Sequence, residues 1–471
     1  MNVHLCAICG MGMGSFAQLL RAGGHRVSGS DASYYPPMSS LLARMEIEIK
    51  TGFSPAHIPP DTDLVIIGNA VRADNPEVEE TLRRGLRYLS FPGALEEMYL
   101  AHRTSVVVAG THGKTTTSSL IALLLHHAGL EPGFLIGGVL RNFDSSSALG
   151  AGPHFVVEGD EYHTAFFDRA PKFLHYRPTI GVLTSVDFDH ADIFSGLDAC
   201  KETFARFASL VPARGKLIAC ADNPHVREIC AGKLAAPVET YGFREDAAWR
   251  LSGYEGSAAG SRFTLSRRGG AAHRVESPLS GTHNALNAAA AFAAASALGV
   301  APGRILSGLT RFQGVKRRQE VCGEARGVTV IDDFAHHPTE VRETIAALKE
   351  RYAGRRVWAV WEPRTNSSRR DFFQDEYPGA FLKADRAIVA GVFHAEQIET
   401  GRRFSPEKLA ADLRGQGVDA RCIERVDDIL AALLAELCPG DVVLVMSNGD
   451  FGKLHERLLA GLGEVTRHSH A

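Results

Sequence analysis

Short apolar, β-branched runs alternate with longer helical patterns along the whole chain. This alternation is typical of βαβ units and predicts an α/β fold with mostly parallel sheets. A segment rich in Gly, Ala, Ser and Arg at 255–277 predicts strands and turns inserted into a domain. The expected strands are 3–9, 26–30, 64–68, 105–109, 154–158, 180–186, 216–221, 328–332, 356–361, 386–390 and 441–446.

The strand series restarts twice along the chain. Glycine turns of the phosphate-binding type open the first two series, at Gly10 and Gly110, and a third series begins near Lys316 without one. Because a domain commonly has about 150 residues, a chain of 471 residues also suggests three domains. We predict domains at 1–103, 104–315 and 316–471.

Composition narrows the class of protein. Hydrophobic residues make up 45% of the chain and charged residues 22%, as in a soluble globular protein. The net charge of -3 gives no field that would recruit nucleic acid or an anionic membrane, so we expect neither partner. There is no signal-peptide pattern and no run of about 18 apolar residues, so we expect a cytoplasmic protein. The eight scattered cysteines predict reduced thiols, with Cys6 and Cys9 as buried strand residues.

Residues 106–117 combine an apolar strand, a glycine turn, a lysine and a hydroxyl before an apolar helix expected near Ser118. Backbone N–H groups at such a turn bind phosphates, Lys114 would neutralise their charge, and Thr115 would coordinate magnesium. A purely structural turn would leave the lysine unexplained, although the glycine spacing is shorter than in the standard motif. The predicted ATP-binding residues here are Gly110, Thr111, His112, Gly113, Lys114, Thr115 and Thr116.

Acidic side chains follow two later strands. Glu158 ends one apolar strand, and a polar cluster containing Asp189 and His190 follows the next. Taken singly, each could be a loop carboxylate or a surface histidine. Because ligands bind at the carboxyl ends of strands in open α/β sheets, the two clusters together predict a metal site formed by Thr115, Glu158 and His190.

Six motifs in this order resemble the Mur ligases, the amide-forming enzymes of bacterial cell-wall precursor synthesis; they lie at 110–117, 158, 189–190, 281–290, 314–320 and 332–339. The resemblance implies an N-terminal UDP-binding domain, a central P-loop ATPase-type domain and a C-terminal ligase domain. It also implies ATP and Mg²⁺ as cofactors, an acyl-phosphate intermediate, and catalytic roles for Lys114, Glu158 and His190. It further assigns Asn287 to the adenine, Arg317 to the phosphates, and Asp332 or its neighbour Asp333 to the ribose.

The N-terminal glycine turn has two interpretations. With an acidic residue after the second strand it could be a dinucleotide fingerprint, which would favour an NAD-linked oxidoreductase. However, 69–77 is similar to the UDP-binding domain of the muramate-ligating members of the family. We therefore assign the turn to a UDP-sugar, with the predicted contacts Gly10, Gly12, Met13, Gly14, Ser30, Asp31 and Asn69.

The run at 161–178 resembles the family branch that joins UDP-N-acetylmuramate to the tripeptide L-Ala-γ-D-Glu-meso-diaminopimelate in peptidoglycan recycling; alanine-adding enzymes have a shorter connection there. Arg364, with Asn366 and His336, is the predicted peptide-binding set, although Arg364 could also be a solvated surface arginine. The hypotheses left open are L-alanine as acceptor, the NAD-linked oxidoreductase, and a nucleotide-gated binding protein without chemistry. We expect a monomer or weak homo-oligomer whose third domain closes on ATP.

The chain departs from the family pattern at two positions. Several members carry a carbamylated lysine where this chain has Phe204, with Lys201 one helical turn earlier, so no carbamate is predicted. Phe334 stands where alanine-adding members usually have tyrosine, so no hydroxyl-dependent role is carried over to it.

Overall fold

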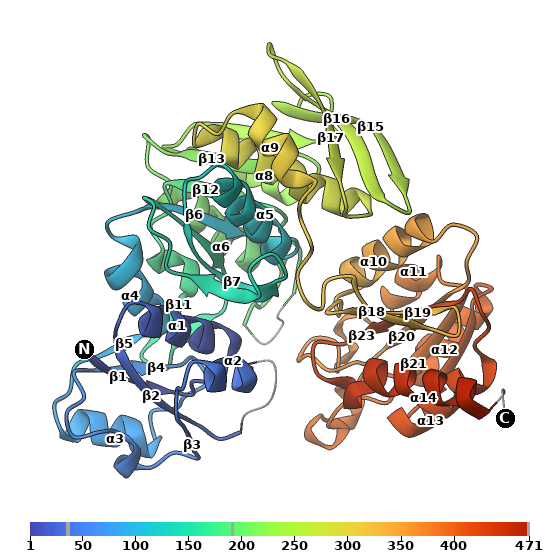
Figure 1. The fold of residues 1–471 in the computed structure, drawn as a ribbon, viewed down its shortest axis with the longest axis horizontal. Helices are drawn as coiled ribbons and strands as arrows, with labels where there is room; N and C mark the ends of the chain where they lie inside the picture. The colour runs from blue at the N-terminus through green and yellow to red at the C-terminus, as the bar shows by residue number, and fades with distance from the viewer. Residues whose placement is uncertain (34–37, 190–192, 469–471) are drawn as a thin grey trace.

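The computed structural model describes residues 1–33, 38–189 and 193–468, without the side chains of 464–468. Three α/β domains follow one another, each built on its own sheet (Figure 1). The N-terminal sheet is parallel, in the order β3-β2-β1-β4-β5. Its elements are β1 Asn2–Cys6, α1 Met11–Ala22, β2 Arg26–Asp31, α2 Met38–Arg44, β3 Ile49–Thr51, β4 Leu64–Ile67, α3 Pro76–Arg83, β5 Tyr88–Ser90 and α4 Phe91–Leu95.

The central domain is built on a ten-stranded sheet in the order β17-β16-β15-β14-β13-β12-β6-β9-β7-β8. Its strands are β6 Thr104–Ala109, β7 Gly133–Leu140, β8 Ser145–Ala148, β9 His154–Gly159, β12 Ile180–Leu183, β13 Lys216–Cys220, β14 Val238–Gly242, β15 Trp249–Ser257, β16 Gly260–Arg267 and β17 Ala272–Ser277. Its helices are α5 Lys114–His127, α6 Leu197–Leu210, α7 Pro224–Cys230, α8 Thr282–Ala297 and α9 Pro302–Leu309. A separate hairpin is formed by β10 His163–Ala165 and β11 Asp168–Pro171.

The C-terminal domain has a six-stranded sheet in the order β18-β19-β23-β20-β21-β22, in which only the pairing of β18 with β19 is antiparallel. Its strands are β18 Glu320–Ala325, β19 Val328–Asp333, β20 Val357–Trp361, β21 Arg386–Ala390, β22 Asp419–Ile423 and β23 Val442–Met446. Its helices are α10 Pro338–Arg351, α11 Tyr377–Phe381, α12 Pro406–Gly415, α13 Val426–Glu436 and α14 Leu454–His468. The expected boundaries near 103 and 315 fall between the sheets.

The predicted α/β class is confirmed, and each predicted strand is present within a few residues. The inserted segment 255–277 belongs to the antiparallel strands β15, β16 and β17, which extend the central sheet. Two details were wrong. Helix α5 begins at Lys114 and not near Ser118, and β1 ends at Cys6, so Cys9 lies in the following turn. All eight cysteines are free thiols.

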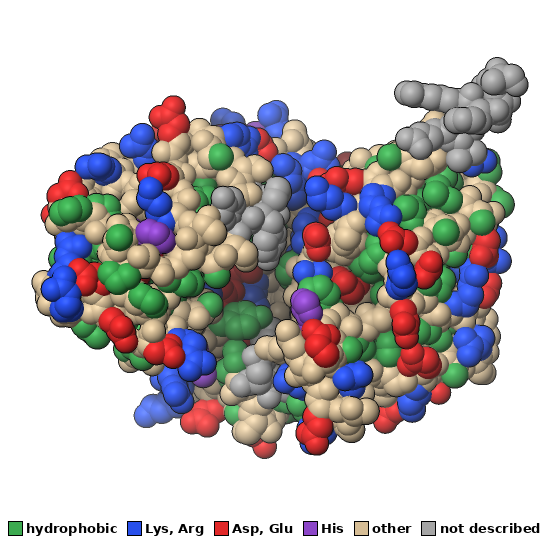
Figure 2. Space-filling model, turned by 90° about the horizontal axis from the view of Figure 1, so that it is seen from below, with side chains coloured by type: hydrophobic (Ala, Val, Ile, Leu, Met, Phe, Trp, Pro, Cys, Tyr) green, Lys and Arg blue, Asp and Glu red, His purple; other side chains and the backbone are tan. Residues whose placement is uncertain are grey.

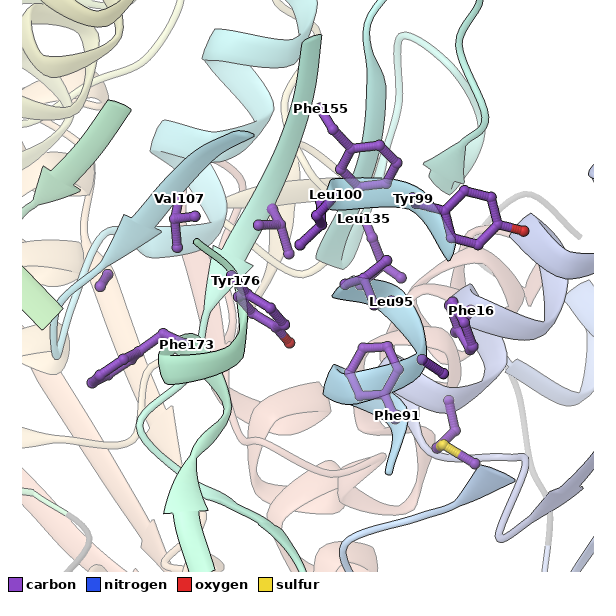
Figure 3. Close-up of a cluster of buried hydrophobic side chains, with 14 of the residues drawn as sticks. Phe16, Phe91, Leu95, Tyr99, Leu100, Val107, Leu135, Phe155, Phe173 and Tyr176 are labelled. Carbon is purple, nitrogen blue, oxygen red and sulfur yellow. The ribbon is translucent and has the colours of Figure 1, made fainter. Parts of the chain in front are cut away.

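The first two domains share a hydrophobic core (Figure 3). Phe91 and Tyr99, from α4 and the turn after it, pack edge-on against Phe16 of α1, and Tyr99 also reaches Phe155 of the central sheet. A buried hydrogen bond of 2.7 Å joins Ser15 Oγ to Ser146 Oγ beside this core. The N-terminal and central domains therefore form one packed unit.

The C-terminal domain meets this unit through polar pairs such as His112 and Glu340, and through Phe188 and Phe373, whose ring centroids are 6.0 Å apart. Seen from below, the surface is hollowed between the N-terminal and C-terminal domains (Figure 2). None of the helices that the structure describes is both long and apolar enough to cross a membrane.

Candidate active site

The turn between β6 and α5 has the shape of a phosphate-binding loop. Gly110 has a φ of 139°, and a Cβ there would lie 2.1 Å from Thr184 Oγ1. Gly113 has a φ of 82° and would place a Cβ 2.6 Å from Asn287 Oδ1. Both positions therefore require glycine. The loop directs the N-terminus of α5, where backbone N–H groups lack helical partners, toward the carboxyl edge of the sheet.

Lys114 is held inside this loop in an ionised state. Its Nζ donates to the carbonyls of Gly110 at 2.7 Å and Thr111 at 3.1 Å, and it pairs with Glu161 at 3.1 Å. Burial alone would lower the pKa of Lys114, but the carboxylates of Glu161, Asp160 and Glu158 outweigh it and raise the pKa. A positive charge is therefore ready where phosphates would lie. Glu161 was missed by the sequence reasoning, because its position after β9 gives no sign of its partner.

Two predicted metal ligands lie together. Thr115 Oγ1 donates to Glu158 Oε1 at 2.9 Å, and the Gly137 N–H donates to the other carboxylate oxygen at 2.8 Å. Burial and the nearby Asp160 raise the pKa of Glu158. A hydroxyl and a carboxylate are oxygen ligands of the kind that magnesium prefers, so these residues fit Mg²⁺. The third predicted ligand, His190, lies outside the described residues.

A cavity of about 620 Å³ opens from the loop toward the C-terminal domain. Its volume is within the range of ligand sites. Its walls combine the loop residues His112, Gly113, Thr115 and Thr116 with Asn287, the aromatic residues Tyr241 and Phe243, and Arg318, Asp333 and Glu343 of the C-terminal domain. The arrangement offers phosphate donors at one end and flat apolar side chains near the other.

Asn287 fixes one wall of this cavity. Its Oδ1 accepts a hydrogen bond from Thr117 Oγ1 at 3.1 Å, and its Nδ2 donates to Asn284 Oδ1 at 3.1 Å. The bond from Thr117 ties α8 to α5 beside Gly113, and the bond to Asn284, within α8, orients the amide. The placement of Asn287 agrees with a nucleotide contact, which remains a prediction.

Arg317 and Asp332 form a pair with each other. Arg317 Nε donates to Asp332 Oδ2 at 3.1 Å, and its Nη2 donates to the carbonyls of Ser447 and Gly449. Of the described residues, it is their neighbours Arg318 and Asp333 that line the cavity. Burial raises the pKa of Asp333 to about 6. Arg318 and Asp333, the second of the two predicted aspartates, therefore lie at the cavity, whereas the predicted Arg317 is held by Asp332.

His112 links the loop to the C-terminal domain. Its Nε2 is 3.3 Å from Asp187, and its Nδ1 is 3.4 Å from Glu340 of α10. Burial would lower the pKa of His112, but these two carboxylates raise it to about 9. The ring of His337 lies 4.8 Å from that of His112, and burial and this cation lower the pKa of His337 to about 4. Glu340 was missed by the sequence reasoning.

His336 and the loop that carries Arg364 and Asn366 approach Asp189. Ser367, in the loop that carries Arg364 and Asn366, donates to Asp189 Oδ1 at 3.0 Å, and His336 Nε2 lies 3.9 Å from Oδ2. The Arg364 guanidinium stacks 3.8 Å from the centroid of the Phe393 ring and pairs with Asp450 at 3.2 Å. Asn366 accepts a hydrogen bond from Arg369 at 2.9 Å. This loop therefore faces the segment that leads to the predicted metal ligand.

The N-terminal glycine turn caps α1, with Gly10 exposed at the carboxyl end of β1. Asp31 accepts the Cys9 N–H at 2.8 Å, and Asn69 is exposed after β4 on the same sheet edge. Gly12 and Gly14 allow close packing. A Cβ at Gly12 would lie 3.2 Å from the Phe91 ring, and a Cβ at Gly14 would lie 2.1 Å from Met38 Sδ.

Two other predicted sugar-nucleotide contacts point inward. Met13 is part of the shared core, and the buried Ser30 donates to Glu77 at 2.5 Å. Their predicted roles at the ligand are therefore less well supported by the geometry than those of Gly10, Asp31 and Asn69.

The structure explains the two positions at which the chain departs from the family pattern. Phe204 is buried against Phe173 at 5.8 Å between ring centroids, and Lys201 pairs with Asp198 and Glu228 on the surface. Phe334 lies under Arg317 and Arg318, 5.3 and 5.1 Å from their guanidinium carbons. A hydroxyl is not needed for this cation–π contact.

Three sequence families match the three domains in order. Residues 2–103 match the Mur ligase family catalytic domain, 108–295 the Mur ligase middle domain, and 317–449 the Mur ligase glutamate ligase domain. The chain is 39% identical to the UDP-N-acetylmuramate–L-alanyl-gamma-D-glutamyl-meso-2,6-diaminoheptandioate ligase of Escherichia coli K12, covering 98% of this chain and 99% of that one.

Other relatives extend the comparison. The UDP-N-acetylmuramate–L-alanine ligase of Paenarthrobacter aurescens TC1 is 37% identical over 98% of this chain and 97% of its own length. The crystal structure of a murein peptide ligase from Psychrobacter arcticus 273-4 superposes with a TM-score of 0.74 at 36% identity, covering 98% of this chain and 99% of that one. Sequence, fold and site agree: the chain belongs to the Mur ligase family.

Proposed function

We propose that the protein is an ATP-dependent ligase that joins the carboxylate of UDP-N-acetylmuramate to the amine of the tripeptide L-Ala-γ-D-Glu-meso-diaminopimelate. The observation that carries this proposal is the cavity between the central and C-terminal domains, bounded by the phosphate loop at one end and by Arg318 and Asp333 of the C-terminal domain. The identity of 39% to an enzyme named for this reaction supports the same assignment.

The chemistry begins with activation of the sugar carboxylate, because a carboxylate and an ammonium do not condense in water. Transfer of the γ-phosphoryl group of ATP gives an acyl phosphate and ADP. Lys114 and the N-terminus of α5 would stabilise the charge on the transferred phosphoryl group. Thr115 and Glu158 would hold Mg²⁺, which screens the phosphate charges when it is bound.

The second step is attack of the peptide amine on the acyl carbon, with phosphate as the leaving group. The loop of Arg364 and Asn366 would orient the peptide, because it lies next to Asp189 at the edge of the central domain. Holding the amine in attack geometry can contribute about 7 to 11 kcal/mol to lowering the barrier. Docking of the C-terminal domain, with its contact from Glu340 to His112, would bring the peptide to the acyl phosphate.

A second candidate function is the same chemistry with L-alanine as acceptor, which the 37% identity to an alanine-adding enzyme favours. The hairpin β10–β11 supports the peptide acceptor, because it lies within 161–178, the run that resembles the tripeptide-joining branch of the family. Phe166 at its turn packs against the N-terminal core, and Phe167 meets Tyr88 edge-on at 5.4 Å between centroids. The hairpin thus spans from the ATP-binding domain to the sugar-nucleotide domain.

Mass spectrometry of the products tests both candidates. The protein is incubated with ATP, magnesium, UDP-N-acetylmuramate and either the tripeptide or L-alanine, and ADP release is measured in parallel. We expect the tripeptide adduct and one ADP per amide. An alanine adduct alone would select the second candidate, and amide formation without ADP would contradict both.

A further inference from the structure

A second group of ligand-type side chains lies inside the N-terminal domain, on the sheet face opposite α1. His4 and Cys6 are alternate residues of β1 and project from the same face, where α3 covers the sheet (Figure 1). Glu77, in the first turn of α3, reaches the same point, and all three side chains are fully buried. Their ligand atoms all lie within 4.8 Å of one another. Among the described residues, this is the one such group of three or more.

We propose that His4, Cys6 and Glu77, together with His57, bind one zinc-type divalent cation. His57 ends the short turn Pro55–His57, and its Nδ1 is 3.1 Å from Glu77 Oε1. The set offers two imidazole nitrogens, one sulfur and one carboxylate oxygen. These are the ligand types and the number that zinc takes in structural sites.

The charges of this set balance. A dication inside a protein must be neutralised by its ligands, because burying an uncompensated charge costs several kcal/mol. The Cys6 thiolate and the Glu77 carboxylate supply two negative charges, and the two histidines bind as neutral rings. Binding forms a metal–sulfur bond and releases the thiol proton of Cys6 to solvent. The occupied site therefore has a net charge of zero.

Two of the donor pairs already lie close to the separations of a tetrahedral site. With metal–ligand bonds of about 2.0 to 2.3 Å, donor atoms lie about 3.3 to 3.6 Å apart. His4 Nε2 is 3.3 Å from Glu77 Oε2, and His57 Nδ1 is 3.1 Å from Glu77 Oε1. The three buried ligand atoms lie within 4.8 Å of one another, and His57 approaches the other carboxylate oxygen, so rotation of His57 and of the Glu77 carboxylate must bring the four donors to tetrahedral distances.

The surroundings also match those of a metal site. Metal-bound histidines commonly use the second ring nitrogen in a hydrogen bond that orients the ring. His4 Nδ1 makes such a contact, at 3.0 Å from Ser28 Oγ, and Ser30 donates to the Glu77 carboxylate. The His57 side chain is 20% exposed, so an ion can reach the site from solvent.

The position of the site suggests what the ion would do. Cys6 is the last residue of β1, and the chain after it enters the glycine turn through Ala7, which has a φ of 64°. A metal bond at Cys6 would fix the end of this strand, and with it the turn that leads into α1. The role is structural and does not depend on the proposed ligase reaction.

Cobalt binding tests the proposal in the full-length protein. The protein is stripped of metal with a chelator, kept reduced, and titrated with Co²⁺ in excess Mg²⁺, which occupies oxygen-ligand sites. We expect one equivalent of Co²⁺ to produce a thiolate-to-cobalt charge-transfer band that Zn²⁺ removes. The band should be lost in Cys6→Ser and retained in Cys230→Ser, a control at a partly buried cysteine of α7. Ser28→Ala should weaken binding by about 10- to 100-fold.

Absence of the band in the wild-type protein would overturn the proposal, whatever the variants do. Retention of the band in Cys6→Ser would overturn it as well. Melting curves of the metal-free proteins show whether Cys6→Ser folds. If it does not fold, the titration uses the His57→Asn variant in its place, since His57 lies in a surface turn. That variant should bind Co²⁺ more weakly, and unchanged affinity would contradict the four-ligand site.

Discussion

Replacing Glu340 with glutamine tests the charged contact between the phosphate loop and the C-terminal domain. Glu340 lies 3.4 Å from His112 and 3.2 Å from His336, and Arg318 is 3.9 Å away. Glutamine keeps the size of the side chain and removes the charge. We therefore expect Glu340→Gln to weaken docking of the C-terminal domain and to lower the pKa of His112.

The magnitude follows from the pKa of His112, which rises from 6.5 to about 9 against the effect of burial. Such a rise corresponds to about 3 kcal/mol of extra stability for the protonated ring. Asp187 and Glu340 supply it together. The contribution of Glu340 is therefore on the order of 1 to 2 kcal/mol, or roughly a tenfold change in the docking equilibrium.

The effect should depend on pH with a defined sign. The pKa of His112 is higher in the folded protein than in the unfolded chain, so its stabilisation is complete below pH 6.5 and is lost as the pH rises through about 9. We expect the melting temperature of Glu340→Gln to lie below that of the wild type at pH values under 6.5. The deficit should shrink above pH 9.

Differential scanning calorimetry at these two pH values measures the deficit. Glu343→Gln is the matched control, because Glu343 lies on the same helix, is partly exposed and approaches His283 only to 3.9 Å. It should change the melting temperature little at either pH. A Glu340→Gln deficit that is absent, or equal at both pH values, would refute the assignment of a charged His112 contact.

Lys114→Ala should lose ADP release while its circular dichroism stays that of the wild type, because the lysine neutralises phosphate charge; retained turnover would remove it from the mechanism. Asp333→Asn should raise the KM for ATP several-fold. Asp332→Asn, which breaks the pair with Arg317, should chiefly lower the melting temperature. The reverse result would favour Asp332 as the ribose ligand. Phe91→Ala should cost about 3 to 5 kcal/mol of unfolding free energy in urea titrations, and a cost below about 1 kcal/mol would contradict a tightly shared core.

The magnesium-binding part of the candidate site could be predicted from sequence, because its residues lie at the ends of strands. Thr115 follows β6 and Glu158 lies near the carboxyl end of β9, and the carboxyl ends of parallel strands meet at one sheet edge. Adjacent residues are harder to distinguish. Arg317 has a φ of 62°, and this backbone turn, invisible in the sequence, sends it to Asp332 while Arg318 lines the cavity.

Contacts between domains could not be predicted. Glu340 meets His112 only because α10 docks on the phosphate loop, and no local pattern in either segment encodes that docking. Within the central domain, the pairing of Glu161 with Lys114 could not be predicted either, because it depends on the course of the chain after β9. Polar residues that look ordinary in sequence thus become part of the site through tertiary structure.

The merged core of the first two domains has a consequence for the order of events. Tyr99 packs on Phe155 of the central sheet, so the first two domains share one core. In the proposed reaction, phosphorylation of the sugar acid would take place within this packed unit, whereas the separate C-terminal domain would bring the peptide amine. Lower temperature or higher viscosity should accordingly slow amide formation more than it slows the preceding phosphoryl transfer.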